Sequence, residues 1–151
     1  MTKAYKFAIS YFLFFSLLLL VSGALLFEQK IGFSIDGILN YYLGNESSFT
    51  QPKSAFGVLK TVLPHIFAFG LFAMVIMHFL IFTKERNKAK TKVLIYLTLI
   101  SALLEIGSPF FIIIGADIFA YIKFISFVLF EALIIYISWL LFYSILKIQK
   151  I

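Results

Sequence analysis

Apolar residues fill four long blocks of this chain, and short polar stretches separate them. The blocks cover about residues 7–27, 55–83, 93–114 and 117–146. Each is close to or longer than the ~20 residues that an α-helix, rising ~1.5 Å per residue, needs to cross a ~30 Å hydrocarbon core. The pattern predicts an all-α protein, a four-helix transmembrane bundle that forms a single membrane domain over residues 1–151.

Several residues indicate where these helices begin, bend and break. Ser54 can cap the free amides of the second helix. Pro64 should bend that helix inside the membrane, because proline removes one backbone hydrogen bond. We expect the third helix to break at residues 107–109, where Gly-Ser-Pro interrupts the apolar run. The long first block exceeds the apolar core of a signal peptide, so we interpret it as a retained anchor.

One extended polar segment, residues 28–53, lies between the first two blocks. Inside it, Ile35, Ile38, Leu39 and Tyr42 recur at helical spacing. This spacing predicts a short amphipathic helix on the membrane surface, with Tyr42 at the level of the lipid headgroups. A partly ordered loop packed on the helix ends is the alternative interpretation.

Positive charge marks one side of the predicted bundle. Residues 84–92 carry five lysine or arginine residues against one glutamate. An excess of cations marks the cytoplasmic side, so we expect this loop and both termini in the cytoplasm, and the 28–53 segment in the periplasm. The cations expected there are Lys3, Lys6, Lys84, Arg86, Lys88, Lys90, Lys92, Lys147 and Lys150. The net charge of +6 is explained by this asymmetry and by the anionic lipid of an inner membrane. We therefore expect no nucleic-acid partner.

Composition narrows the class of protein further. With 62% hydrophobic residues, 13% charged residues and a mean hydropathy of +1.04, the chain lies far outside the range of soluble domains. The absence of cysteine excludes disulfides, thiolate metal sites and iron–sulfur clusters. A serine–histidine–acid constellation and a glycine-rich phosphate loop are also missing, which argues against a hydrolytic enzyme.

Polar side chains inside the membrane are costly, and each is a functional hypothesis. They are His65, His78, Glu105, Lys123 and Glu131. We interpret Glu105 and Lys123, near the outer ends of their helices, as an ion pair or as snorkelling side chains that anchor helix three to helix four. Glu131 lies near the bilayer centre with no cation at matching depth. It is interpreted as protonated, as bonded to Ser101 or Tyr136, or as part of a proton path.

Both histidines lie in the second block, thirteen positions apart, which is about 20 Å along a helix. One imidazole therefore lies toward each membrane face. This segment resembles the membrane cytochromes b, in which histidine pairs on transmembrane helices ligate two b-type haems. The resemblance implies that His65 and His78 are axial ligands of haem b iron, and that Gly70 and Met74 lie beside the macrocycle.

Two features depart from that family. Thirteen residues at ~100° each leave the two imidazoles ~140° apart around the helix. Two haems with paired histidines also need four such ligands, and this chain has two histidines. A symmetric homodimer would supply the rest. The alternatives are one haem per chain with Met74 or Met77 as the second ligand, or a partner subunit that provides the missing imidazole.

Three functional hypotheses follow. The first is a b-type haem protein for transmembrane or quinone-linked electron transfer, working as a homodimer. The second is a non-catalytic accessory or assembly subunit of a larger membrane complex, with structural histidines. The third is a small carrier or proton-coupled channel that uses Glu131, Glu105 and the histidines, although few polar residues line a path.

Overall fold

The computed structural model describes residues 3–81, 83 and 87–147, and its regular structure is helical. The helices are α1 (Lys3–Lys30), α2 (Ile35–Leu43), the short 3-10 helix η1 (Glu46–Ser48), α3 (Ala55–Leu80), α4 (Ala89–Ile112) and α5 (Ile118–Lys147). Four of them, α1, α3, α4 and most of α5, are long and apolar enough to cross a membrane. The predicted all-α, four-helix transmembrane fold is confirmed.

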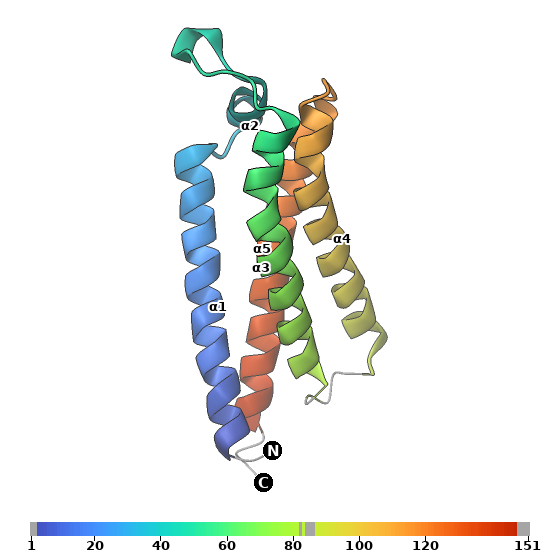
Figure 1. Ribbon diagram of the computed structural model, residues 1–151. Coiled ribbons are helices and arrows are strands. Elements are labelled where there is room, and N and C mark those ends of the chain that lie inside the picture. The colour runs from blue at the N-terminus through green and yellow to red at the C-terminus, as the bar shows by residue number, and fades with distance from the viewer. Residues whose placement is uncertain (1–2, 82, 84–86, 148–151) are drawn as a thin grey trace.

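The four long helices run alternately up and down, and α2 lies at one end of the bundle (Figure 1). The start of α1 and the end of α5 lie together at the opposite end. Helix α5 is central, because it packs against α1, α2, α3 and α4. Helix α1 packs mainly on α5 and stands apart from α4. The gap that this arrangement leaves beside α1 is where the candidate site forms.

The predicted short helix is present as α2, but its apolar face packs on the bundle, so Tyr42 is buried in the protein and not placed among lipid headgroups. Ile38 and Tyr42 are buried in a cluster that also contains Phe27, Val58 and Phe127. Helix α2 thereby joins α1, α3 and α5 at the end of the bundle opposite the start of α1. A second buried cluster, at the other end, packs α1, α3 and α4 around α5.

Serine caps begin both α2 and α3. The Ser34 hydroxyl accepts a hydrogen bond of 2.9 Å from the Gly37 amide, and the Ser54 hydroxyl accepts one of 3.1 Å from the Gly57 amide. Each cap satisfies one of the free amides of a first helical turn. Helix α3 then continues through Pro64 to Leu80, three residues short of the predicted end.

The expected break at residues 107–109 is wrong. Helix α4 runs unbroken through Pro109 to Ile112. A proline inside a helix leaves the carbonyl oxygen of the residue four positions earlier without its amide donor, which here is that of Glu105. The Lys123 Nζ atom of α5 donates to this oxygen at 3.3 Å, so a neighbouring helix repairs the defect. The chain turns only at Gly115, which has a positive φ of 90°.

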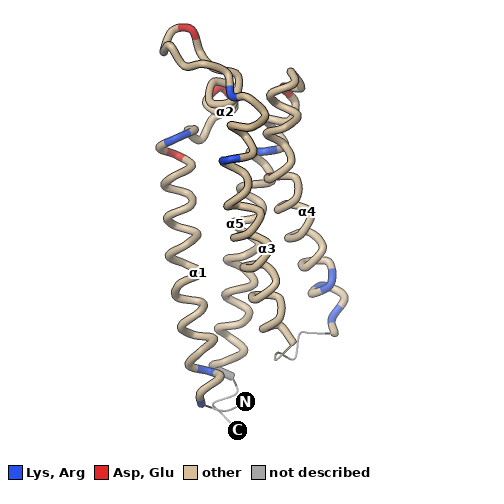
Figure 2. Tube along the Cα trace, in the orientation of Figure 1, with Lys and Arg blue, Asp and Glu red and all other residues tan. Residues whose placement is uncertain are grey.

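Charged residues gather at the two ends of the bundle (Figure 2). The lysines that open α1 and those that open α4 lie at the same end, as an alternating arrangement of spans requires. Lys84, Arg86 and Lys150 lie outside the described residues. The assignment of this end to the cytoplasm stays a prediction.

Candidate functional site

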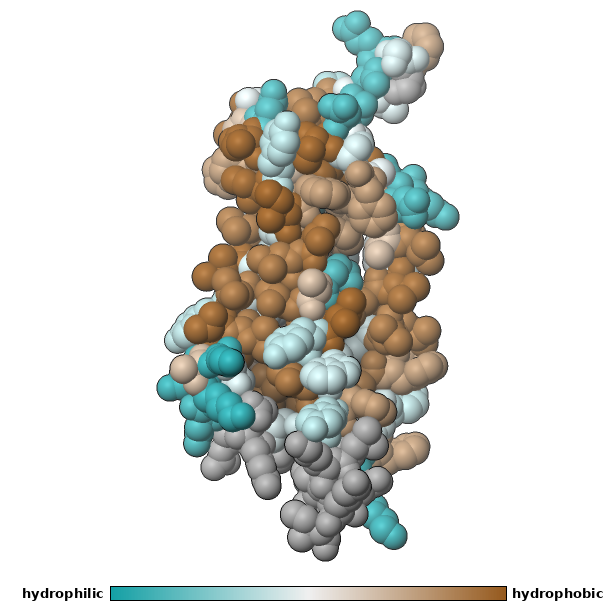
Figure 3. Space-filling model, turned by 180° about the vertical axis from the view of Figure 1, so that it is seen from behind, coloured by the Kyte–Doolittle hydropathy of each residue, from teal (hydrophilic) through white to brown (hydrophobic). Residues whose placement is uncertain are grey.

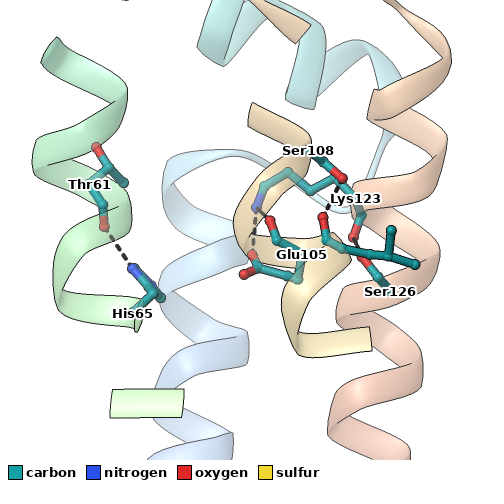
Figure 4. A network of polar contacts seen from close by, with 7 residues as sticks. Thr61, His65, Glu105, Ser108, Lys123 and Ser126 are labelled. Atoms are coloured by element: carbon teal, nitrogen blue, oxygen red, sulfur yellow. Dashed lines mark hydrogen bonds and ion pairs between the residues drawn. The ribbon is translucent and has the colours of Figure 1, made fainter. Parts of the chain in front are cut away.

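Glu105 of α4 and Lys123 of α5 form a buried ion pair (Figure 4). The Lys123 Nζ atom lies 2.5 Å from Glu105 Oε1, and the two side chains are only 5% and 8% exposed. The structure thus brings together the two residues that the sequence proposed as an anchor between these helices. The carboxylate and the freed Glu105 carbonyl share one ammonium group, so two buried acceptors depend on Lys123.

Hydroxyl groups beside the pair do not take part in it. Ser108 donates to the Leu104 carbonyl of its own helix, and Ser126 donates to the Lys123 carbonyl at 3.1 Å (Figure 4). Serines inside helices commonly bond to the preceding turn in this way. The ammonium group of Lys123 can donate three hydrogen bonds, and the two contacts to Glu105 leave a third available.

Tyr42 of α2 lies over the ion pair. Its ring centroid is 5.9 Å from Lys123 Nζ, and the residue is 2% exposed. Burial, followed by the negative charge of Glu105 and the neighbouring Tyr41, raises the pKa of the Tyr42 hydroxyl above its usual range, so this group keeps its proton. Within the described residues the Tyr42 hydroxyl makes no hydrogen bond. The hydroxyl group therefore has its bonding capacity unused, in a residue that lines a cavity.

The Tyr42 hydroxyl and the ion pair face a cavity of about 300 Å³ beneath α2. The cavity lies between α1 and α3, with α5 and part of α4 behind it. Most of its wall is apolar, and the charged or hydrogen-bonding side chains that reach it beyond the end of α1 include Tyr42, Thr61, His65, Glu105, Lys123 and Glu131. Pockets of this size and lining are typical of small-molecule sites.

The cavity is open at the side of the bundle. Lining residues of α1 such as Leu19 and Leu26, and of α3 such as Pro64 and Ala68, are exposed on the outer surface. The stacked rings of Phe27 and Phe127, with centroids 4.2 Å apart, form part of the cavity wall. Since both α1 and α3 are candidate membrane spans, the opening faces the lipid.

His65 lies on the flank of α3 that borders the cavity. Its Nδ1 atom is 2.7 Å from the Thr61 carbonyl oxygen (Figure 4). A carbonyl can only accept, so Nδ1 carries the proton, and Nε2 of the neutral ring is an acceptor. The ring also meets Phe69 edge-on at 5.6 Å. The structure therefore presents an oriented imidazole to the cavity.

Glu131 lies deeper on the same cavity wall and is half-buried. A Cβ atom added to Gly23 of α1 would be 3.7 Å from Glu131 Oε1, so the missing side chain makes room for the carboxyl group. The hydroxyl partners proposed from the sequence do not bond it: Ser101 donates to the Thr98 carbonyl at 2.9 Å, and Tyr136 is exposed. Figure 3, which views the molecule from behind, shows a hydrophilic residue in a furrow whose walls are mostly hydrophobic.

The structure separates the residues that the cytochrome resemblance grouped together. His65 borders the cavity, whereas His78, Gly70 and Met74 are exposed elsewhere on α3 and do not line it. Among the described residues no group of three or more histidine, cysteine, aspartate or glutamate side chains is placed to hold a metal ion. The two histidines are therefore not brought together within a single chain, and the assignment of either one to haem stays a prediction.

Tyr42 is the residue of the site that sequence reasoning missed. The signal was its place on the apolar stripe of α2, two residues of which, Ile38 and Tyr42, are fully buried. Nothing local indicated that this stripe would cover a polar group.

Comparisons with known proteins give a family but no characterised relative. A family model described as a transmembrane helical domain matches residues 32–151, which covers α2 to α5. No curated protein matches the chain, and no solved structure matches it.

Proposed function

The chain belongs to the Aq_1264_TM family of transmembrane helical domains, and from this premise we propose that it binds a lipid-soluble amphiphile of the isoprenoid quinone class in the side cavity. The proposal rests on two hydrogen-bond donors at the α2 end of the cavity, the Tyr42 hydroxyl and the Lys123 ammonium group. The Tyr42 hydroxyl has no hydrogen-bond partner among the described residues, and Lys123 has a donor to spare. Both residues line the cavity, so a ligand there that accepts hydrogen bonds can use these donors.

The chemistry of a quinone fits these groups. Its ring oxygens accept hydrogen bonds in the oxidised form, which suits Tyr42 and Lys123. In the reduced form they are hydroxyl groups that also donate, which suits Nε2 of His65. Its isoprenoid tail is apolar and can leave through the opening between α1 and α3 into the lipid.

In this proposal the protein takes part in quinone-linked electron transfer. The electron partner is a neighbouring membrane subunit or a second copy of the chain. The apolar outer surfaces of α3 and α4 offer room for either partner within the bilayer. This keeps the accessory-subunit hypothesis as one form of the same function, with the quinone site as its contribution.

Tyr42→Phe tests the proposal. We expect the variant to bind decylubiquinone about 2- to 10-fold more weakly than the wild type, because one hydrogen bond of about 0.5–1.5 kcal/mol is lost. Binding is measured by equilibrium titration of the full chain in lipid nanodiscs. Tyr121→Phe, the same change at an exposed tyrosine on α5, is the control and should not alter the affinity. Equal affinities for wild type and Tyr42→Phe, or no saturable binding, would refute the proposal.

Haem b is a second candidate ligand, favoured by one observation. The Nδ1–H group of His65 bonds to a backbone carbonyl, an arrangement found at metal-bound histidines, where it orients the ring. The second ligand would come from another copy of the chain or from a partner subunit. Haem would supply one-electron redox chemistry, and His65 would orient and hold it.

A reduced-minus-oxidised visible spectrum tests this second candidate. If His65 is an axial ligand, protein purified in mild detergent shows a Soret band that His65→Ala removes. If His78 binds the iron through a second copy, His78→Ala removes it as well. Retained absorbance in both variants, or a colourless wild type, would refute ligation by these histidines and leave the quinone proposal to its own test.

A further inference from the structure

Glu131 lies close to the middle of the bilayer. It is about 20 Å from the start of α5 and about 24 Å from its end, at ~1.5 Å per residue. Lys123 lies about 12 Å nearer to the outer end of the same helix by this rise. Glu131 is therefore too deep to pair with Lys123, which is bonded to Glu105.

No residue of the described chain forms a hydrogen bond or ion pair with Glu131. The cavity wall around it is made of apolar side chains, with Leu19 and Leu20 from α1, Phe72 from α3 and Phe130 from α5. The titratable groups that line the same cavity are Lys30 of α1, Tyr41 and Tyr42 of α2, His65 of α3, Glu105 of α4 and Lys123 of α5. Among them, Lys30 and His65 have no ion-pair partner in the described part of the chain.

A carboxyl group in this position is costly and needs a reason. The Glu131 side chain does not anchor α5 to α1, because the residue of α1 that faces it is Gly23, which has no side chain to bond it. It does not form part of a metal site among the described side chains. It does share a cavity with His65 and with the ion pair, so one cavity connects this carboxyl group with the polar groups nearer α2.

We propose that Glu131 is a proton-exchange site at the inner end of the side cavity. Its carboxylate takes up a proton that enters through the cavity, and the carboxyl group returns the proton the same way. Gly23 keeps the approach to the carboxyl group open. The inference goes beyond ligand binding and does not require the ligand to be a quinone.

Dicyclohexylcarbodiimide, an apolar reagent, tests this site on the full chain in lipid nanodiscs. The proton of a carboxyl group passes to a carbodiimide nitrogen, and the carboxylate oxygen bonds to the central carbon. The acyl group then migrates from oxygen to a nitrogen of the reagent. This gives a stable N-acylurea, which peptide mass spectrometry locates. We expect labelling of Glu131 that increases as the pH falls, and no such labelling in Glu131→Gln.

Two further measurements make the result specific. Gly23→Leu should reduce labelling of Glu131 several-fold, since the new side chain fills the approach, while Gly107→Leu, with open space around it, should not. A water-soluble carbodiimide should label the exposed Glu28 and Glu46 instead. Absence of labelling at Glu131 in the folded wild type at every pH would overturn the inference. The quinone titration of Tyr42→Phe would be unaffected by that outcome, so the two proposals fail separately.

Discussion

Replacing Lys123 with methionine is expected to lower the free energy of unfolding by about 3–5 kcal/mol, the range typical for breaking one side of a buried ion pair. The change leaves the Glu105 carboxylate buried with no cation. It also removes the donor from the Glu105 carbonyl, which Pro109 already deprives of its helical partner. Unfolding in mixed micelles, with the fraction of sodium dodecyl sulfate increased stepwise and helix content followed by circular dichroism, measures the effect.

Two variants control this prediction. Lys60→Met makes the same change at an exposed lysine of α3 and should cost little. Glu105→Gln combined with Lys123→Met removes both charges and should recover much of the lost stability, because no charge is then left unpaired. If Lys123→Met is as stable as Lys60→Met, the ion pair does not hold α4 to α5.

Replacing Gly37 with alanine is expected to destabilise the protein by about 1–3 kcal/mol, the usual cost of forcing extra atoms into a packed site. A Cβ atom at Gly37 would overlap the carbonyl oxygen of Ile31, which is backbone and cannot rotate away. Helix α2 must then shift, and Tyr42 moves with it. We therefore expect weaker quinone binding together with the loss of stability, measured by the same micelle titration and by the decylubiquinone titration.

Gly57→Ala is the matched control. Gly37 and Gly57 both follow a capping serine by three residues, and both donate their amide to its hydroxyl. The nearest atom to a Cβ at Gly57 is the Ser54 hydroxyl oxygen at 3.5 Å, an ordinary contact. Gly57→Ala should therefore be neutral or slightly stabilising. Equal stabilities of the two alanine variants would contradict the close docking of α2.

The sequence predicted the elements of the fold well because their signals are local. Four apolar blocks of sufficient length give the four long helices, and helical spacing from Ile35 to Tyr42 gives α2. The interaction of Glu105 with Lys123 was also foreseeable, because opposite charges at similar depth in adjacent spans have few other partners in lipid.

The continuation of α4 through Pro109 and the presence of the cavity could not be predicted from the sequence, because both depend on contacts between helices. The hydrogen bond that lets α4 continue through Pro109 comes from a lysine on another helix, so no local pattern contains it. The cavity depends on the separation of α1 from α3, which is a property of helix packing. The polar role of Tyr42 depends in turn on what its ring covers.

The surroundings of the two histidines also depend on helix packing, which the sequence does not reveal. Their spacing predicted that the imidazoles would point in different directions around the helix, and the structure places His65 at the cavity and His78 outside its lining. The resemblance to cytochromes b gave both histidines the same kind of role, as haem ligands, whereas the packing around α3 gives them different surroundings.

Photoaffinity labelling with a short-chain quinone that carries an azide on its ring tests the central claim most directly. The full chain in lipid nanodiscs is irradiated, and the labelled peptides are located by mass spectrometry. Binding in the side cavity predicts labels on α1 between Leu19 and Lys30 and on α3 between Thr61 and Phe72, which excess decylubiquinone removes. Labels centred on the outer face of α3 around Met74, or labels that decylubiquinone does not displace, would contradict it.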